Sequence, residues 1–319
     1  MNLRPLVTYC LGAVVALCDC SVQAMANDDV VPPAAAEVTV TAERPGPRLW
    51  RVTNGANTLW ILGTQAPLPR GMRWRSAEVE AAIAASNEVF GAYSVSLSMI
   101  GLQPVEPQPL QRVLPRKVYA RWVAMRDKYI DPGIRTEDLL PASAALLLQA
   151  SAYERAGLTS TDDLWRSIYG LARLHDVPVR SQEFEIDRQS REKVSQRQAR
   201  EAGVRFLMHT MDRLETELAA STRRANAWAD GDLPTLMQLA PSDESYAEAL
   251  ARSWPFLGAE EVDRIIEIED SRLAAAYDRA LRRNRTTFAA LPMHLLTKRS
   301  GVLSILAATG YQIEQPWDE

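Results

Sequence analysis

The chain has 319 residues, of which 47% are hydrophobic and 24% are charged, with 36 Lys and Arg against 40 Asp and Glu. These proportions are typical of a globular protein, and they exclude a low-complexity disordered chain, a collagen-like rod and a coiled coil. The formal net charge of -4 argues against nucleic acid as the main partner, because phosphate binding needs a basic stripe.

Residues 1–26 have the pattern of a cleaved secretory signal peptide. One basic residue, Arg4, precedes an apolar run over 6–18, and Ala24-Met25-Ala26 has the small-x-small pattern that a signal peptidase cuts. The apolar run is too short and too interrupted for a membrane-spanning helix, which needs about 20 apolar residues. We therefore expect a periplasmic or secreted protein, cleaved near Ala26, with no transmembrane segment in the mature chain.

The three cysteines, Cys10, Cys18 and Cys20, all lie inside this predicted signal peptide. The mature chain would then contain no cysteine, which removes disulfides, thiolate zinc ligands and cysteine nucleophiles together. Stability in an oxidising compartment must therefore come from core packing.

The next segment, residues 27–47, is rich in Asp, Pro, Ala and Val, and we expect it to form a flexible tether before an ordered domain over 48–319. That domain opens with two short apolar runs, 49–53 and 58–63. The turn Asn54-Gly55-Ala56-Asn57 separates them, so the pattern predicts a β-hairpin.

The rest of the chain alternates between helical and strand-like periodicity. Apolar residues at three- and four-residue spacing predict a helical insertion over about 108–240. We expect helices over 76–86, 116–129, 141–156, 161–175, 187–230, 233–239, 259–281 and 301–309, and strands over 87–96, 177–184, 286–291 and 311–314. Because helices alternate with strands at both ends and crowd the middle, the predicted fold is α/β, with α+β as the alternative. Its centre would be a mixed β-sheet flanked by helices.

Short motifs along the ordered domain occur in the order of one known family. Near the start they are Leu49-Trp50-Arg51-Val52, Leu59-Trp60-Ile61-Leu62-Gly63-Thr64 and Asn87-Glu88-Val89-Phe90. At the end they are Phe288-Ala289-Ala290-Leu291-Pro292-Met293-His294-Leu295, Gly301-Val302-Leu303 and Gly310-Tyr311-Gln312-Ile313-Glu314. Between them stand Pro178-Val179 through Glu183, Trp228-Ala229-Asp230-Gly231-Asp232-Leu233 and Arg272. In this order the motifs resemble the TraB/GumN family, whose relatives include the Tiki-type proteases, over nearly the whole mature chain.

The resemblance implies a hydrolase-like or metalloprotease-like site built from two GxxH motifs, carboxylates and an arginine. This chain departs from that pattern, since its first motif reads Gly63-Thr64-Gln65-Ala66 and has no histidine. The acidic pair expected on the following strand falls near Ala92 and Ser94, and the second motif keeps His294 but has Leu291 in the glycine position.

Three residues of the implied catalytic set remain, namely Glu183, Arg272 and His294. If a divalent metal is bound, His294 and Glu183 would be its ligands, but catalytic zinc usually needs three, so the residues favour a site without metal. Without metal, Glu183 could orient His294 for acid–base chemistry while Arg272 stabilises an anion. In the structural alternative Glu183 pairs with Arg180 or Arg188, Arg272 binds a carboxylate, and His294 is a core residue.

The missing histidine and carboxylates predict a catalytically degenerate binding or regulatory module, whose partner would be a periplasmic peptide, protein or envelope component. The alternative is a metallopeptidase-like hydrolase with an altered site that uses Glu183, Arg272 and His294. A role in envelope polysaccharide is suggested only by the family name and the compartment. Two further histidines, His175 and His209, lie on predicted helices without metal-ligand spacing and are interpreted as structural.

Overall fold

The computed structural model describes residues 44, 46–72, 77–98, 106, 108–159, 162–187, 195–239 and 259–316. The predicted signal peptide and nearly all of the predicted tether therefore lie outside the described residues. None of the helices in these ranges combines the length and the apolar content that crossing a bilayer requires.

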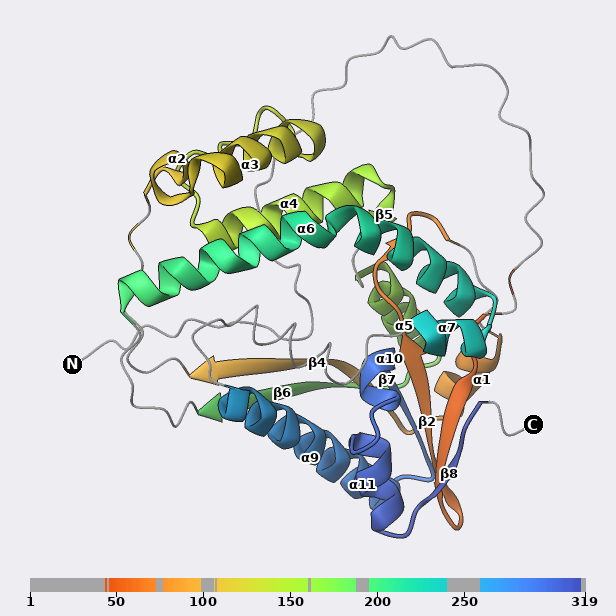
Figure 1. Ribbon diagram of the computed structural model, residues 1–319. Coiled ribbons are helices and arrows are strands. Elements are labelled where there is room, and N and C mark those ends of the chain that lie inside the picture. The colour runs from red at the N-terminus through yellow and green to blue at the C-terminus, as the bar shows by residue number, and fades with distance from the viewer. Residues whose placement is uncertain are drawn as a thin grey trace, which may run out of the picture.

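A six-stranded mixed sheet forms the centre of the described structure, with the strand order β6-β4-β7-β2-β1-β8 (Figure 1). Its strands are β1 (Leu49–Asn54), β2 (Asn57–Thr64), β4 (Glu88–Ser98), β6 (Val179–Asp187), β7 (Thr286–Pro292) and β8 (Gln312–Glu314). The four strands β6, β4, β7 and β2 run parallel, whereas β1 is antiparallel to both β2 and β8. Two short strands, β3 (Leu68–Pro69) and β5 (Leu158–Thr159), form a separate antiparallel pair. The predicted fold class, a central mixed sheet flanked by helices, is confirmed.

The hairpin predicted at the start of the domain is confirmed as β1 and β2. Its turn is closed by the pair Asn54 and Asn57, and Gly55 has a φ of 58°. Glycine reaches this left-handed region without steric cost, which suits the turn between two strands.

Helices cover both faces of the sheet. They are α1 (Ala77–Ala84) and α5 (Asp162–Leu174), which pack against each other, and α9 (Ala259–Arg283), which packs against β1, β2, β6 and β7. From β2, the chain crosses the sheet toward β6: α1 connects β2 to β4, and α5 precedes β6. It then turns back, and α9 leads into β7, which lies between β4 and β2. Because parallel connections are right-handed, α1 and α5 lie on one face and α9 on the other.

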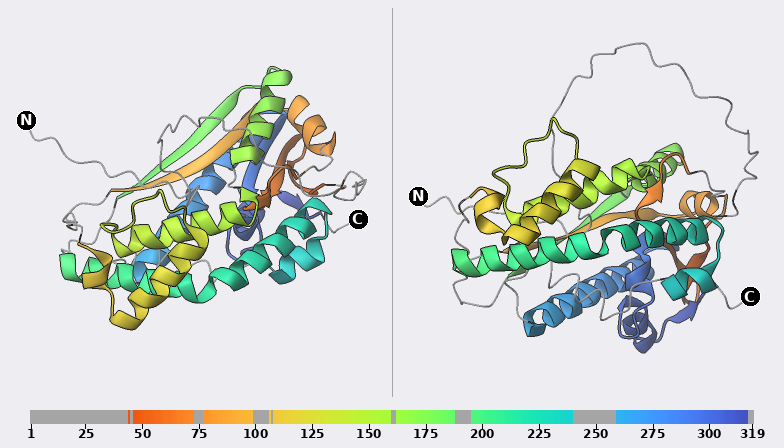
Figure 2. Two further views of the ribbon diagram at one scale, coloured as in Figure 1. Left: turned by 90° about the horizontal axis from the view of Figure 1, so that it is seen from above. Right: turned by 45° about the horizontal axis from the view of Figure 1, so that its top comes forward.

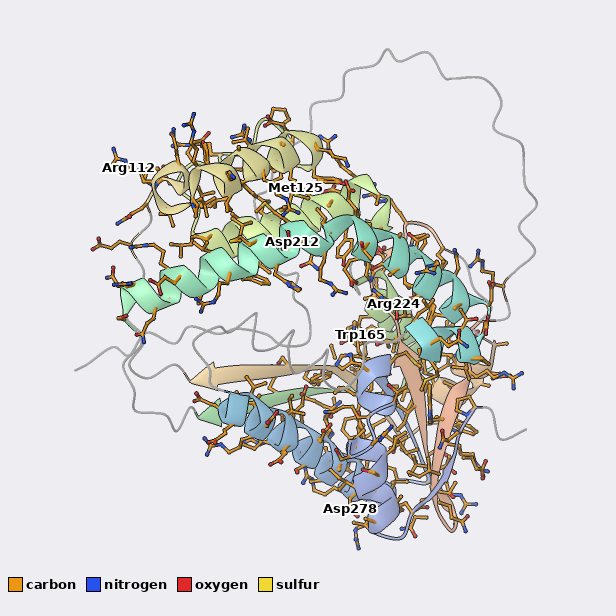
Figure 3. All side chains as sticks on the ribbon, in the orientation of Figure 1. Arg112, Met125, Trp165, Asp212, Arg224 and Asp278 are labelled. Carbon is orange, nitrogen blue, oxygen red and sulfur yellow. The ribbon has the colours of Figure 1, made fainter. Side chains whose placement is uncertain are left out.

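The last helices and strand are held against α9. After the short helix α10 (Met293–Leu296), α11 (Val302–Ala308) packs beside α9 and leads into β8. Near the lower end of α9 in Figure 3, Asp278 accepts a hydrogen bond of 2.6 Å from the hydroxyl of Tyr311. Arg282, and then this hydroxyl, lower the pKa of the Asp278 carboxyl.

A second group of helices forms its own core beside the sheet (Figure 2). It contains α2 (Leu110–Val113), α3 (Arg116–Tyr129), α4 (Pro141–Arg155) and the first half of α6 (Gln196–Ala229). The other half of α6, followed by α7 (Leu233–Leu239), contributes Ala225, Trp228 and Leu233 to the core of the sheet. One helix of 34 residues therefore belongs to both cores.

The start of α6 differs from the prediction of a helix from residue 187. Asp187 still belongs to β6, and the helix begins only after Ser195. The Ser195 hydroxyl accepts from the Gln198 backbone N–H at 3.2 Å, and the Gln198 side chain accepts from the Ser195 N–H at 2.9 Å. This reciprocal capping box fixes the first turn.

Candidate functional site

The two sequence motifs lie side by side at one edge of the sheet. In the parallel pair of β2 and β7, Gly63 is opposite Leu291 and Thr64 is opposite Pro292. Gln65 therefore leaves the end of β2 next to the point where His294 follows β7. The carboxyl ends of parallel strands are where open α/β sheets place their ligands, so we take this edge as the candidate site.

The glycine of the first motif is enclosed by three large side chains. A Cβ on Gly63 would lie 2.3 Å from Met293 Sδ and 2.7 Å from a ring carbon of Trp50. The buried indole Nε1 of Trp228 donates to the Gly63 carbonyl at 2.6 Å. Residues from β1, α6 and α10 thus meet at this glycine, and packing alone accounts for its lack of a side chain.

The two residues after this strand carry little chemistry. Gln65 is buried, and its Nε2 donates to the neighbouring Ala66 carbonyl at 2.8 Å. Where the GxxH pattern has an imidazole, Ala66 has a methyl group. The side chains of these two residues therefore offer at most one amide oxygen to a ligand.

The acidic pair implied by the resemblance is also replaced. The pairing of β4 with β6 is irregular between Phe90 and Tyr93. Within that irregular segment the Ala92 N–H donates to the Tyr169 hydroxyl of α5 at 3.0 Å, and the Gly91 carbonyl accepts from Gln182 Nε2 at 3.4 Å. This segment therefore forms hydrogen bonds with α5 and β6, and it supplies no carboxylate.

His294 lies on α10 directly after β7, and its Nε2 atom is buried. Burial, with a smaller contribution from the ammonium of Lys298, lowers the pKa of His294 from its ordinary value of 6.5 to about 3. The imidazole is therefore neutral at neutral pH and is a weak base.

We expect His294 to make the stability of the protein fall in mild acid. The unfolded chain binds a proton at about pH 6.5 and the folded chain only at about pH 3, so stability is lost as the pH falls through this window. Between pH 7.5 and pH 5 the loss from this residue is about 2 kcal/mol. Urea unfolding of wild type and His294→Gln at both pH values measures it. The variant should lack this part of the pH dependence, and equal pH dependence in the two proteins would contradict the assignment.

Two adjacent carboxylates on α9 are fully buried, Glu269 at 0% and Asp270 at 3% exposure. The ammonium of Lys298, a residue that follows α10, donates to Asp270 Oδ2 at 2.6 Å. Both side chains of this ion pair are almost inaccessible to solvent, with 6% of Lys298 and 4% of Asp270 exposed.

These carboxylates are level with the strand ends. The C-terminal end of α9 is joined to the start of β7 by a two-residue connection, so α9 runs antiparallel to β7. On α9, Tyr277 contacts Phe90 with ring centroids 5.2 Å apart, and Phe90 is opposite Ala289 of β7. Glu269 lies two turns earlier, about 12 Å along the helix axis, which brings it to the level of the last residues of β7.

Sequence reasoning missed Glu269, Asp270 and Lys298. The sequence pattern does mark Glu269, because this residue continues the apolar stripe of α9. The buried positions of this stripe are Val262, Ile265, Leu273, Tyr277 and Ala280. A carboxylate within such a stripe must be buried, and buried carboxylates need a partner.

Glu183 is not on the same side of the sheet as this cluster. It is exposed and lies opposite Ser94 in the pairing of β6 with β4. The preceding Gln182 is buried near Tyr277 of α9, and successive strand residues point to opposite faces. Arg180, one predicted partner of Glu183, instead donates to Glu88 Oε2 at 2.9 Å. The other, Arg188, lies outside the described residues.

Arg272 belongs to α9, one turn after Glu269, and is half-buried. The structure thus places His294 and Arg272 at or near the strand ends, with Glu183 on the other face.

Of the two histidines interpreted as structural, His175 contacts Glu80 at 3.2 Å and joins α5 to α1, and His209 lies within α6.

The metal that the resemblance implies does not fit the donor groups of this site. Ala66 and Ala92 have no donor atom in their side chains, and the Gln65 amide nitrogen donates to the Ala66 carbonyl, which leaves a single neutral amide oxygen. The buried ammonium of Lys298 lowers the pKa of His294, and the same charge disfavours a second cation there. In the part of the chain that the structure describes, no group of three or more His, Cys, Asp or Glu side chains is arranged to hold a metal ion.

The comparisons with known proteins agree with the arrangement of the motifs. The model of the TraB/PrgY/gumN family matches residues 48–315, a range that begins just before β1 and ends just after β8. No curated protein and no solved structure matches the chain. Since the family match covers most of the chain and includes both strand-end motifs, the protein belongs to the TraB/PrgY/gumN family.

Proposed function

We propose that this protein is an exported family member that has lost metal-dependent catalysis and acts as a binding or regulatory module. One observation carries the proposal. Where the two motifs meet, polar groups are engaged with their neighbours, since the Lys298 ammonium is paired with Asp270 and the Gln65 amide nitrogen donates to the Ala66 carbonyl. A catalytic site needs groups that can change partners during a reaction, whereas these are held in place.

The expected compartment follows from the sequence. Residues 1–26 have the three parts of a secretory signal, and all the cysteines lie within them. The partner of the exported protein would be a periplasmic peptide, protein or envelope component. The N-terminal sequence of the purified protein tests this point. We expect it to start at Asn27 in an extracytoplasmic fraction, and a protein that keeps Met1 in the cytoplasmic fraction would contradict it.

A hydrolase that uses Glu183, Arg272 and His294 is less well supported. A general base works best with a pKa near the pH of the reaction, and the pKa of His294 is about 3. Glu183 lies on the other face of the sheet and so does not orient the imidazole.

Turnover of peptide and ester substrates by the mature protein separates the two functions. We expect the wild type, His294→Gln and Glu183→Gln to show the same rate as buffer. Hydrolysis by the wild type that is lost in His294→Gln, with an unchanged melting temperature, would overturn the binding-module proposal.

A further inference from the structure

The strand β6 forms one edge of the central sheet and has a long open side. It has nine residues, and within the described residues it pairs with β4 alone. The left view of Figure 2 shows it, in green, as the outermost strand. The opposite edge of the sheet is formed by β8, which has only three residues. An edge strand presents a row of N–H and C=O groups to which a further strand can be added.

The backbone of β6 alternates between β4 and the open side. The Val89 N–H of β4 donates to the Pro178 carbonyl at 2.9 Å, and Val89 is opposite Val179 in this parallel pair. A residue in a parallel ladder bonds to the two neighbours of the residue opposite it, so Val179 turns its own N–H and C=O away from β4. The same holds for every second residue after it, including Ser181 and Glu183. Among the residues that the structure describes, none bonds to these outward backbone groups.

The first half of β6 has few of the features that usually protect an edge strand. Proline, glycine and lysine do not occur in residues 179–187, although prolines and lysines commonly block the addition of a strand. The irregularity of the pair lies between Phe90 and Tyr93, where β4 supplies the extra residue, so β6 itself is regular. Val179 is 44% exposed, and Ser181 and Glu183 are exposed as well. This side of the sheet is therefore regular and accessible.

The charges of β6 indicate which kind of strand it would accept. Acidic residues occupy every second position from Glu183, since Glu185 and Asp187 follow it. In the pairing with β4 these positions are opposite three serines, which are neutral. Opposite charges on directly paired residues of neighbouring strands are favourable, and like charges are unfavourable. An added strand with lysine or arginine at alternate positions therefore fits, whereas a second copy of β6 would bring further acidic residues to the same face.

The intervening positions of β6 favour apolar residues in the same partner. Gln182 is buried near Tyr277 of α9, and Phe184 is partly buried against the core of the sheet. Since side chains alternate between the faces of a strand, an added strand would place its intervening residues beside these two. Apolar side chains there would remove more of the Phe184 ring from water, which is favourable.

We propose that the outer edge of β6 binds an extended peptide segment, in which basic residues alternate with apolar residues, as an additional strand of the sheet. In this mode of recognition, backbone hydrogen bonds supply affinity and the alternating side chains supply specificity. The inference rests on the proposed function, because it names the partner of a binding module. It assigns that partner to the edge of the sheet and not to the strand-end motifs.

The probe for this edge is the peptide Lys-Val-Lys-Val-Lys-Val-Lys, labelled with a fluorophore and titrated with the mature protein by fluorescence anisotropy. The control Glu-Val-Glu-Val-Glu-Val-Glu keeps the strand propensity and reverses the charge. The control Lys-Val-Lys-Pro-Lys-Val-Lys keeps the charge and interrupts the strand. We expect each control to bind at least about 10-fold more weakly than the probe. Equal binding of the probe and the proline peptide would show charge attraction without strand addition, and would overturn the inference.

Variants of β6 test where the probe binds. Ser181→Pro removes an outward N–H and keeps the bonds to β4, because proline is tolerated on an edge strand when its nitrogen faces away from the sheet. We expect it to weaken binding about 10-fold or more, whereas Ser181→Thr, which keeps the N–H, should bind like the wild type. Glu183→Lys should weaken binding of the probe by about 10-fold and strengthen binding of the glutamate peptide. If Ser181→Pro does not fold, Glu183→Lys decides the result, since Glu183 is exposed.

A wild type that does not bind the probe would overturn the inference, as would binding that Ser181→Pro and Glu183→Lys leave unchanged. A wild-type dimer that Ser181→Pro dissociates would also overturn it, and would assign the edge to a second copy. None of these results touches the proposed loss of catalysis. Conversely, hydrolysis that depends on His294 would refute the proposed function whether or not the probe binds, so the two failures are distinguishable.

Discussion

Replacing Asp270 by alanine is expected to lower the free energy of unfolding by about 3–5 kcal/mol. The reason is the buried ammonium of Lys298, which would lose the carboxylate that lies 2.6 Å from it. Only 6% of the Lys298 side chain is exposed, so water cannot replace that partner without local unfolding. Urea unfolding of the mature protein measures the change.

The double variant Asp270→Asn with Lys298→Met serves as the control for this prediction. It removes both charges and keeps similar volumes, and exchanging a buried ion pair for neutral groups is often close to neutral for stability. We expect it to unfold within about 1.5 kcal/mol of the wild type. A single variant Asp270→Ala as stable as the wild type would show that the pair is open to solvent.

Replacing Trp228 by alanine is also expected to lower the free energy of unfolding by about 3–5 kcal/mol. Trp228 is 1% exposed in the core of the sheet, and its indole donates to the Gly63 carbonyl. The alanine variant loses a large buried ring and leaves that carbonyl without its donor. Because Trp228 lies at the end of α6, the change also loosens the attachment of the long helix to β2.

Trp228→Phe separates the hydrogen bond from the packing. It keeps most of the ring and should cost about 1–3 kcal/mol, the penalty for a buried carbonyl that loses its donor. Trp60, which is half-buried on β2, provides the comparison, and Trp60→Ala should be less costly than Trp228→Ala. Equal costs in thermal or urea unfolding would mean that Trp228 has no special role at the strand ends.

Much of the local structure could be predicted because its signals are local. The helix expected over 116–129 is α3 with the same bounds, and the helix over 233–239 is α7. In both, the apolar spacing and the breaks on either side are visible within one short window. The hairpin was predictable for the same reason, since its strands are separated only by a glycine-containing turn.

Features that depend on distant partners could not be predicted in this way. The helix α10 has four residues, which is too short to show a helical period. The pairing of β2 with β7 joins segments more than 200 residues apart. The contact of Asp270 with Lys298 also depends on how α9 crosses the strand ends, and neither residue alone reveals it.

The predicted site residues illustrate the same limit. His294 could be located because its motif resembles the second GxxH motif of the family, and the structure places it at the strand ends. Glu183 is implied by the same resemblance, as an acidic residue that ends a strand, but a strand alternates between faces, and the sequence does not say which face meets α9. Glu269 was overlooked, although its place in the apolar stripe of α9 marks it as buried.

The central claim, that this strand-end site works without a metal ion, is tested most directly by the metal content of the mature, exported protein. Elemental mass spectrometry of tag-free protein, with His294→Gln prepared in parallel, is the measurement. The account predicts no stoichiometric metal in either protein. About one metal ion per wild-type chain that is lost in His294→Gln would contradict it, and would mean that the site has been rebuilt around a metal.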